Sequence, residues 1–305
     1  MQKTDTIAKL ALLLATIIWG SSFIIMKDAL DNIGTFFLLA VRFTGACLLL
    51  AIVFFAKLKK INKDVVKAGF VMGSVLIAAY IVQTFGLAET TPGKNAFLTA
   101  GYCILVPFLF WAVAGTKPDR YNIIAAVMCI AGIGLVALDD NLTMGRGDVL
   151  TLLCCAFYAF HIIVSARYTQ VYDVMMLTLL QFFFAALWSS ALCLLFEPLP
   201  NMAEVPAYTW FSLAYLCVFA TAGALGLQTY GLKYTSPSAG ALILSLESVF
   251  GVLFSIMVGA ETVTPRLVIG FVVIFVAIVV SETKLEFLFK KKHPPKYKVR
   301  MNDET

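Results

Sequence analysis

One short polar segment occurs twice in this chain, each time between two long apolar runs. It reads QTFGLAETTPGKNAF from Gln83 and QTYGLKYTSPSAGAL from Gln228. In both copies a Thr or Ser stands directly before a proline, at Pro92 and Pro237. This pair is a helix-start signal, because the hydroxyl accepts from free backbone N–H groups and proline suits the first helical position. Each copy therefore predicts a short joint between two helices.

The composition of the chain is that of a membrane protein. Apolar residues make up 61% and charged residues 13%, whereas soluble domains have about half and about a quarter. The apolar residues form long runs without the alternation of strands, as membrane-spanning helices require. We expect an all-α polytopic protein with ten transmembrane helices, at about 7–26, 34–56, 65–87, 92–114, 121–138, 148–168, 174–196, 207–231, 236–258 and 267–286.

The duplication extends beyond the joints. At one constant offset Trp19, Ser22 and Arg42 correspond to Tyr158, His161 and Gln181. Five helices per copy is an odd number, so the two copies must face opposite ways across the membrane. We expect two inverted five-helix repeats, at residues 1–143 and 144–286, followed by a basic tail at 287–305. Inverted repeats place a binding site near the membrane midplane at their interface.

Most of the lysines and arginines lie on one expected face, which also holds both termini. Basic residues collect on the cytoplasmic side, so both termini are expected in the cytoplasm and the protein in the cell membrane. The cluster Lys290–Lys292 is expected to contact anionic lipid headgroups. Because the net charge of +5 resides in loops and tail, it does not indicate nucleic-acid binding. The seven cysteines lie inside apolar runs without metal spacing, so we expect no disulfide framework, metal or cofactor.

Glu247 is the acidic residue that lies deep inside an expected helix. It lies roughly 15 Å along the axis from Pro237, near the middle of a hydrocarbon core about 30 Å thick. A carboxylate there usually marks an ion, proton or substrate path. Gly240 and Gly251 on the same face are expected to leave room for a ligand. The alternative is a structural pair of Glu247 with Arg42 or with hydroxyls such as Ser245. Arg42 could itself hold a substrate carboxylate, or be a structural partner of Glu247 or of backbone carbonyls.

Further candidates come from helix spacing and from the repeat. Trp19 with Ser22, and Tyr158 with His161, are spaced i, i+3 and so share one helix face. Their rings could stack on a substrate or receive a cationic group, with ordinary packing as the alternative. His161 is either a proton carrier or a hydrogen-bonded packing residue. Tyr102 holds the repeat position of Glu247.

These candidates are expected to line one central cavity. Gln83 and Gln228 stand near joints that must move, so we expect them to act as gates. Satisfaction of backbone groups is the alternative role for their amides.

The chain resembles the EamA-type ten-helix permeases of the drug/metabolite transporter superfamily over residues 7–286. The resemblance is carried by IIWGSSFIIMK, by AVRFTGACLLL, by the two QT-x-GL-x-x-T-x-P joints and by LESVFGVLFSIMVGAETVT. The acid that often closes the fourth helix of the family is Thr116 here, while Glu261 keeps it in the second copy. The resemblance implies secondary transport, mostly export, of amino acids or other small metabolites.

We therefore expect an alternating-access transporter of a small organic solute, not an enzyme. Its partners would be the solute, the lipid bilayer and, as a candidate coupling ion, the proton; a homodimer is an option. The main alternative is a membrane-embedded enzyme acting on lipid, which would need clustered acids, metal ligands or an activated nucleophile. A third reading is a membrane scaffold, which would not explain an acid at the midplane.

Overall fold

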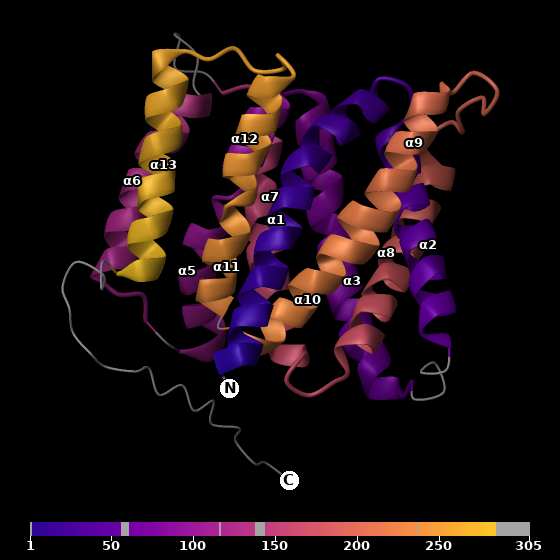
Figure 1. Cartoon of the computed structure of the whole chain (residues 1–305), viewed down its shortest axis with the longest axis horizontal. Helices are drawn as coiled ribbons and strands as arrows, with labels where there is room; N and C mark the ends of the chain where they lie inside the picture. Colours follow the sequence, from indigo (N-terminus) through magenta and orange to yellow (C-terminus); the bar gives the residue numbers. More distant parts are fainter. Residues whose placement is uncertain (1, 56–60, 116, 138–143, 236, 285–305) are drawn as a thin grey trace.

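The structure is a computed structural model that describes residues 2–55, 61–115, 117–137, 144–235 and 237–284. Its helices run up and down in one bundle, with the N-terminus at the lower end in Figure 1, here called the N-terminal face. Their bounds are α1 Gln2–Leu30, α2 Thr35–Val53, α3 Lys63–Ala88, α4 Pro92–Thr99, α5 Tyr102–Ala114, α6 Arg120–Ala137, α7 Arg146–Tyr168, α8 Val174–Phe196, α9 Ala207–Tyr215, η2 Leu216–Gly223, α10 Ala224–Tyr234, α11 Pro237–Ser245, α12 Glu247–Met257 and α13 Pro265–Thr283.

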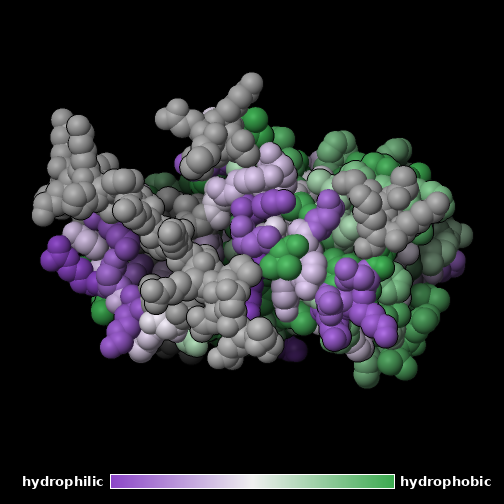
Figure 2. Space-filling view, turned by 90° about the horizontal axis from the view of Figure 1, so that it is seen from below, coloured by the Kyte–Doolittle hydropathy of each residue, from purple (hydrophilic) through white to green (hydrophobic). Residues whose placement is uncertain are grey.

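The predicted all-α polytopic membrane fold is confirmed. Within the described ranges, seven helical segments are long and apolar enough to cross a membrane by length and composition, and three shorter apolar helices occupy the remaining expected spans. Large apolar side chains such as Ile52 and Phe196 project from the flanks and are 76% and 71% exposed. Viewed from the N-terminal face, hydrophilic residues gather on the end of the bundle and hydrophobic residues form its rim on one side (Figure 2).

The two expected joints are present. α3 ends at Ala88 and α4 begins at Pro92, where the Thr91 hydroxyl accepts from the backbone N–H of Lys94 at 3.3 Å. In the second copy α11 begins at Pro237, whereas the preceding Ser236 lies outside the described residues. The second joint lies at the N-terminal face and the first at the opposite end, beside the α12–α13 loop (Figure 1).

Two membrane-spanning segments are interrupted at their middle, which the sequence did not predict. Residues 100–101 separate α4 from α5, and Leu246 separates α11 from α12. At each interruption the chain tightens into a 3₁₀ turn: Gly101 donates to Leu98 at 3.0 Å, and Leu246 to Ile243 at 3.1 Å. Gly101 and Leu246 hold equivalent positions in the repeat, so the two halves are interrupted at the same place.

The expected span 207–231 is not one uniform α-helix, because η2 in its middle is a π-helix. The Thr221 hydroxyl donates to the carbonyl of Leu216, five residues back, at 2.8 Å. Such wide turns often occur at functional sites. Here the carbonyl of Ala220 accepts from the indole N–H of Trp19 at 2.8 Å and from Arg42 at 3.4 Å.

The packing of the helices follows the duplication. In one set of neighbours α3 packs against α7 and α8, and in the matching set α10 and η2 pack against α1 and α2. Two further large interfaces join equivalent helices, α2 with α8 and α6 with α13, while α12 packs against α1 and α4. Both halves therefore contribute to the centre of the bundle. The predicted boundary near residue 143, the tail 287–305 and its Lys290–Lys292 cluster lie outside the described residues.

Candidate functional site

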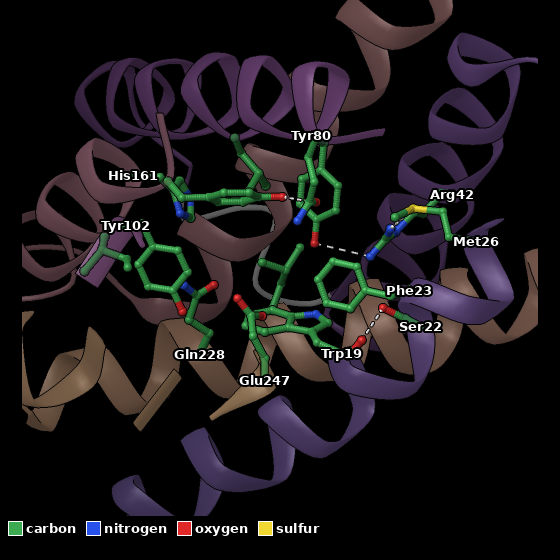
Figure 3. Close-up of a pocket in the computed structure, with 15 residues that line it drawn as sticks. Trp19, Ser22, Phe23, Met26, Arg42, Tyr80, Tyr102, His161, Gln228 and Glu247 are labelled. Carbon is green, nitrogen blue, oxygen red and sulfur yellow. Dashed lines mark hydrogen bonds between the residues drawn. The ribbon is translucent and has the colours of Figure 1, made fainter. Parts of the chain in front are cut away.

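A central cavity lies among α1, α2, α3, α5, α7, α10 and α12 (Figure 3). Its volume is small, since only about 30 Å³ can hold the centre of a water molecule. The space is thus narrow, and a solute would need these side chains to move. Every candidate residue from the sequence lies on its wall: Trp19, Ser22, Arg42, Gln83, Tyr102, Tyr158, His161, Gln228 and Glu247.

Tyr80 is the polar residue of the wall that the sequence analysis missed. Its hydroxyl accepts from the Arg42 guanidinium at 3.2 Å, and its ring centroid lies 4.5 Å from the guanidinium carbon. The ring also meets Tyr158 edge-on at 5.7 Å between centroids, and Tyr158 meets Tyr102 at 6.1 Å. Tyr80 stands three residues before Gln83 on one helix face, a signal that could have identified it. The other missed residues are Phe23, Met26, Leu76, Ile162 and Leu225.

Arg42 is 1% exposed and its donors are used within the bundle. It donates to the Thr221 hydroxyl at 2.5 Å as well as to Tyr80 and to the Ala220 carbonyl. Among the described residues it forms no ion pair with Glu247, and the two lie at opposite ends of the cavity in Figure 3. The alternative of an Arg42–Glu247 pair is therefore wrong, because hydroxyl groups of α3 and η2 and the backbone carbonyl of Ala220 bind the guanidinium.

Glu247 is the first residue of α12, and Tyr102 is the first residue of α5. The Glu247 side chain is 6% exposed and lies on the cavity wall near Tyr102 (Figure 3). The expectation that Gly240 and Gly251 leave room for a ligand is wrong. A side chain added at Gly240 would meet Leu232, and one at Gly251 would meet Ala96, so both glycines serve close helix packing.

One of the two ring nitrogens of His161 is hydrogen-bonded to neighbouring side chains, and the other is not. Its Nε2 lies 3.0 Å from the Gln181 amide oxygen, and Gln181 donates in turn to the Thr229 hydroxyl at 3.3 Å. The Nδ1 atom is buried and has no hydrogen-bond partner within the described part of the chain. This arrangement links α7, α8 and α10 and leaves one ring nitrogen of His161 free on the cavity wall.

Trp19 and Ser22 are fixed by bonds to the backbone. The indole N–H of Trp19 donates to Ala220, and the Ser22 hydroxyl donates to the carbonyl of Trp19 at 2.8 Å. The indole therefore presents its ring, not its N–H group, to the cavity. No group of three or more His, Cys, Asp or Glu residues among the described ones is placed to hold a metal ion.

The two glutamines lie in the cavity wall with similar burial, 4% exposed for Gln83 and 5% for Gln228. The Gln83 amide oxygen accepts from the Tyr158 hydroxyl at 2.6 Å, and its nitrogen donates to Thr99 at 3.2 Å. These bonds connect α3 with α4 and α7. Both glutamines thus face the same space as Glu247, and their gating role stays a prediction.

The helical bundle with its central polar cavity defines a polytopic membrane protein of the transporter class. The chain belongs to the EamA-like transporter family, whose model matches residues 6–138 and 145–283. This confirms the family expected from the sequence, and the chain is a membrane transporter.

Individual relatives agree with this assignment. The chain is 32% identical to an uncharacterized transporter of Archaeoglobus fulgidus over 283 residues, which cover 91% of this chain and 86% of that protein. It is 20% identical to the uncharacterized transporter YoaV of Bacillus subtilis over 268 residues, which cover 86% of this chain and 91% of YoaV. A solved crystal structure shares the fold with a TM-score of 0.68 at 17% identity, and the match covers 91% of this chain and 98% of that one.

Proposed function

We propose that this chain is a secondary transporter that exports a small amphipathic metabolite, such as an amino acid or a related solute, by alternating access. The observation that carries the proposal is a central cavity to which both halves contribute. α1, α2, α3 and α5 supply one part of its wall, and α7, α10 and α12 supply the rest. A solute held between two such halves is exposed to either membrane face when one half rocks against the other.

The chemistry of the wall favours one kind of solute. The rings of Trp19, Tyr80, Tyr102 and Tyr158 form apolar surfaces, and Glu247 supplies a carboxyl group at one end. Aromatic faces attract apolar groups and cations. A solute with an apolar body and a neutral or cationic head therefore suits this wall better than a dianion.

The symmetry of the bundle supports alternating access. Its joints lie at opposite faces, and both halves are interrupted at equivalent positions, next to Tyr102 and Glu247. Joints at opposite faces and equivalent interruptions are what two inverted repeats, at 1–143 and 144–286, would have. The bias of basic residues supports termini in the cytoplasm of a cell whose plasma membrane holds the protein. The outward direction of transport rests on the resemblance to the permease family.

Flux measurements in proteoliposomes test the proposal. We expect saturable counterflow of at least one radiolabelled amino acid or amine, reduced at least tenfold by Glu247→Gln. Glu204→Gln serves as a matched control, because Glu204 lies in an exposed turn and does not line the cavity. Absence of flux above protein-free liposomes for a broad set of solutes would contradict transport. Conversion of a lipid in the same vesicles would favour the enzyme.

A further inference from the structure

Two glutamines at equivalent repeat positions have opposite hydrogen-bonding states. Both amide atoms of Gln83 are bonded, to Tyr158 and to Thr99. Gln228 makes no side-chain hydrogen bond to any described residue, and its amide oxygen is fully buried. Buried polar groups in proteins are nearly always paired. The described chain offers no partner to the Gln228 amide, so a ligand is the natural source of one.

The difference arises because both partner positions change between the copies. The position of Tyr158 is held by Trp19 in the first half, and the indole N–H is already bonded to the Ala220 carbonyl. The position of Thr99 is held in the second half by Leu244, which is fully buried and has no polar atom. The substitutions thus remove the donor and the acceptor that a glutamine in this position would use.

The unpaired amide points into the cavity beside other polar groups. In Figure 3 the side chains of Gln228, Tyr102 and Glu247 lie together at one end of the cavity, with Trp19 next to Glu247. An amide oxygen and a carboxyl group both accept hydrogen bonds. Arg42, the cation of the wall, lies at the other end. The end near Gln228 is therefore suited to a donor group with positive charge.

We propose that Gln228 and Glu247 form a subsite for the ammonium head of a primary amine, including that of an amino acid. This inference rests on the proposed transport function and names the chemistry that its cavity selects. An ammonium group has several N–H donors, which can serve the Gln228 amide oxygen and the Glu247 carboxyl group together. The ring of Trp19 covers the apolar part of the solute. A quaternary ammonium carries the same charge but has no hydrogen to donate to Gln228.

Binding to the purified full-length protein in detergent at pH 7 tests the subsite. The probes are 2-phenylethylammonium, its N,N,N-trimethyl analogue and 3-phenylpropanoate, each measured by the rise of the melting temperature with concentration. We expect the primary ammonium to bind at least tenfold more tightly than the trimethyl analogue, and the anion to give no shift. Equal affinity for both cations, or no shift with any probe, overturns the proposal.

Variants at the two glutamines separate binding from folding. Gln228→Leu should reduce the preference for the primary over the quaternary cation to less than twofold, while the melting temperature without ligand stays equal or rises. Gln83→Leu, the reference for a structural role, should lower that melting temperature, because Tyr158 and Thr99 lose their partners. Gln228→Met, of similar length, should repeat the Gln228→Leu result.

Two further outcomes distinguish this inference from the function on which it rests. If Gln228→Leu destabilises the ligand-free protein as strongly as Gln83→Leu, Gln228 is structural and the subsite is overturned, whatever the flux. If the preference for the primary cation is present but no solute crosses proteoliposomes, transport fails while the subsite stands.

Discussion

The hydroxyl of Thr91 donates a 2.6 Å hydrogen bond to the carboxyl group of Glu261 and so joins the start of α4 to the loop between α12 and α13. Close by, Thr90 donates to Asp148 at 2.6 Å, and the ammonium of Lys94 lies 3.6 Å from the same carboxylate. Each contact links the first half of the chain to the second. They lie at the face opposite the N-terminus, so opening the cavity there must break them.

The Thr91–Glu261 contact predicts a pH-dependent stability. Burial raises the pKa of Glu261 above 4.5, although the Thr91 hydroxyl and Lys94 act in the opposite direction. A group whose pKa is raised by folding stabilises the protein below its unfolded pKa, and this contribution is lost as the pH rises through the folded pKa. Glu261→Gln stays neutral, so its melting temperature should rise relative to the wild type between pH 4 and pH 8. A difference that falls over this range would contradict the reasoning.

The donor side of this contact can be tested separately. Thr91→Val removes the hydroxyl that donates to the Glu261 carboxyl group. Hydrogen bonds to charged groups contribute about 1.5–3 kcal/mol to the free energy of unfolding. We expect a loss of that order in the free energy of unfolding at pH 8 and a smaller loss at pH 4. Thr90→Val is the comparison, since it breaks the neighbouring bond to Asp148 and leaves Glu261 bonded. Equal losses at both pH values would show that the ionisation of Glu261 has no part in this contact.

Glu247 and Arg42 should behave as independent residues. Glu247→Gln should fold normally yet lose solute flux, because no cation of the described chain depends on it as an ion-pair partner. Arg42→Met should melt early, because Thr221 and Tyr80 lose their donor. In the double variant the two stability changes should add to within about 0.5 kcal/mol. Rescue of a destabilised Glu247→Gln protein by Arg42→Met would reveal the buried pair, whose breakage costs about 3–5 kcal/mol.

Cysteine labelling tests the predicted gating by the two glutamines. Gln83 lies near the end of α3 at one face, and Gln228 near the end of α10 at the other. Because both are buried here, Gln83→Cys and Gln228→Cys should react slowly with a membrane-impermeant maleimide in the absence of substrate. A substrate that shifts the conformation should raise the rate at one position and lower it at the other. Unchanged rates under conditions of demonstrated flux would count against gating.

The predicted topology places the two ends of the first half on opposite sides of the membrane. A reporter fused at Thr305 should be cytoplasmic, and one inserted at Gly145, just before α7, should be external. The physical reason is the preference of Lys- and Arg-rich segments for the cytoplasmic side. Detection of both reporters in the same compartment would rule out inverted five-helix repeats.

Much of the site could be predicted because the chain is duplicated. Glu247 stands out as an acid in an apolar run, and the constant offset then identifies Tyr102 in the first copy. The spacing i, i+3 adds Ser22 and His161 to the aromatic residues Trp19 and Tyr158. All of these lie on the wall of one cavity. Tyr80 is also spaced i, i+3 from Gln83. It was missed because its position in the second copy is held by the apolar residue Leu225.

The sequence by itself determined the membrane-spanning helices, the joints at Pro92 and Pro237, and the equivalence of the two halves. These follow from hydropathy and from local capping chemistry, which act between residues close along the chain. Only the tertiary structure decided that Arg42 bonds to Thr221 and not to Glu247, and that Gln83 is paired while Gln228 is not. Those partners lie on other helices, and which side chains meet depends on how the helices pack. The position of η2 against α1, for example, brings the Ala220 carbonyl within reach of the Trp19 indole.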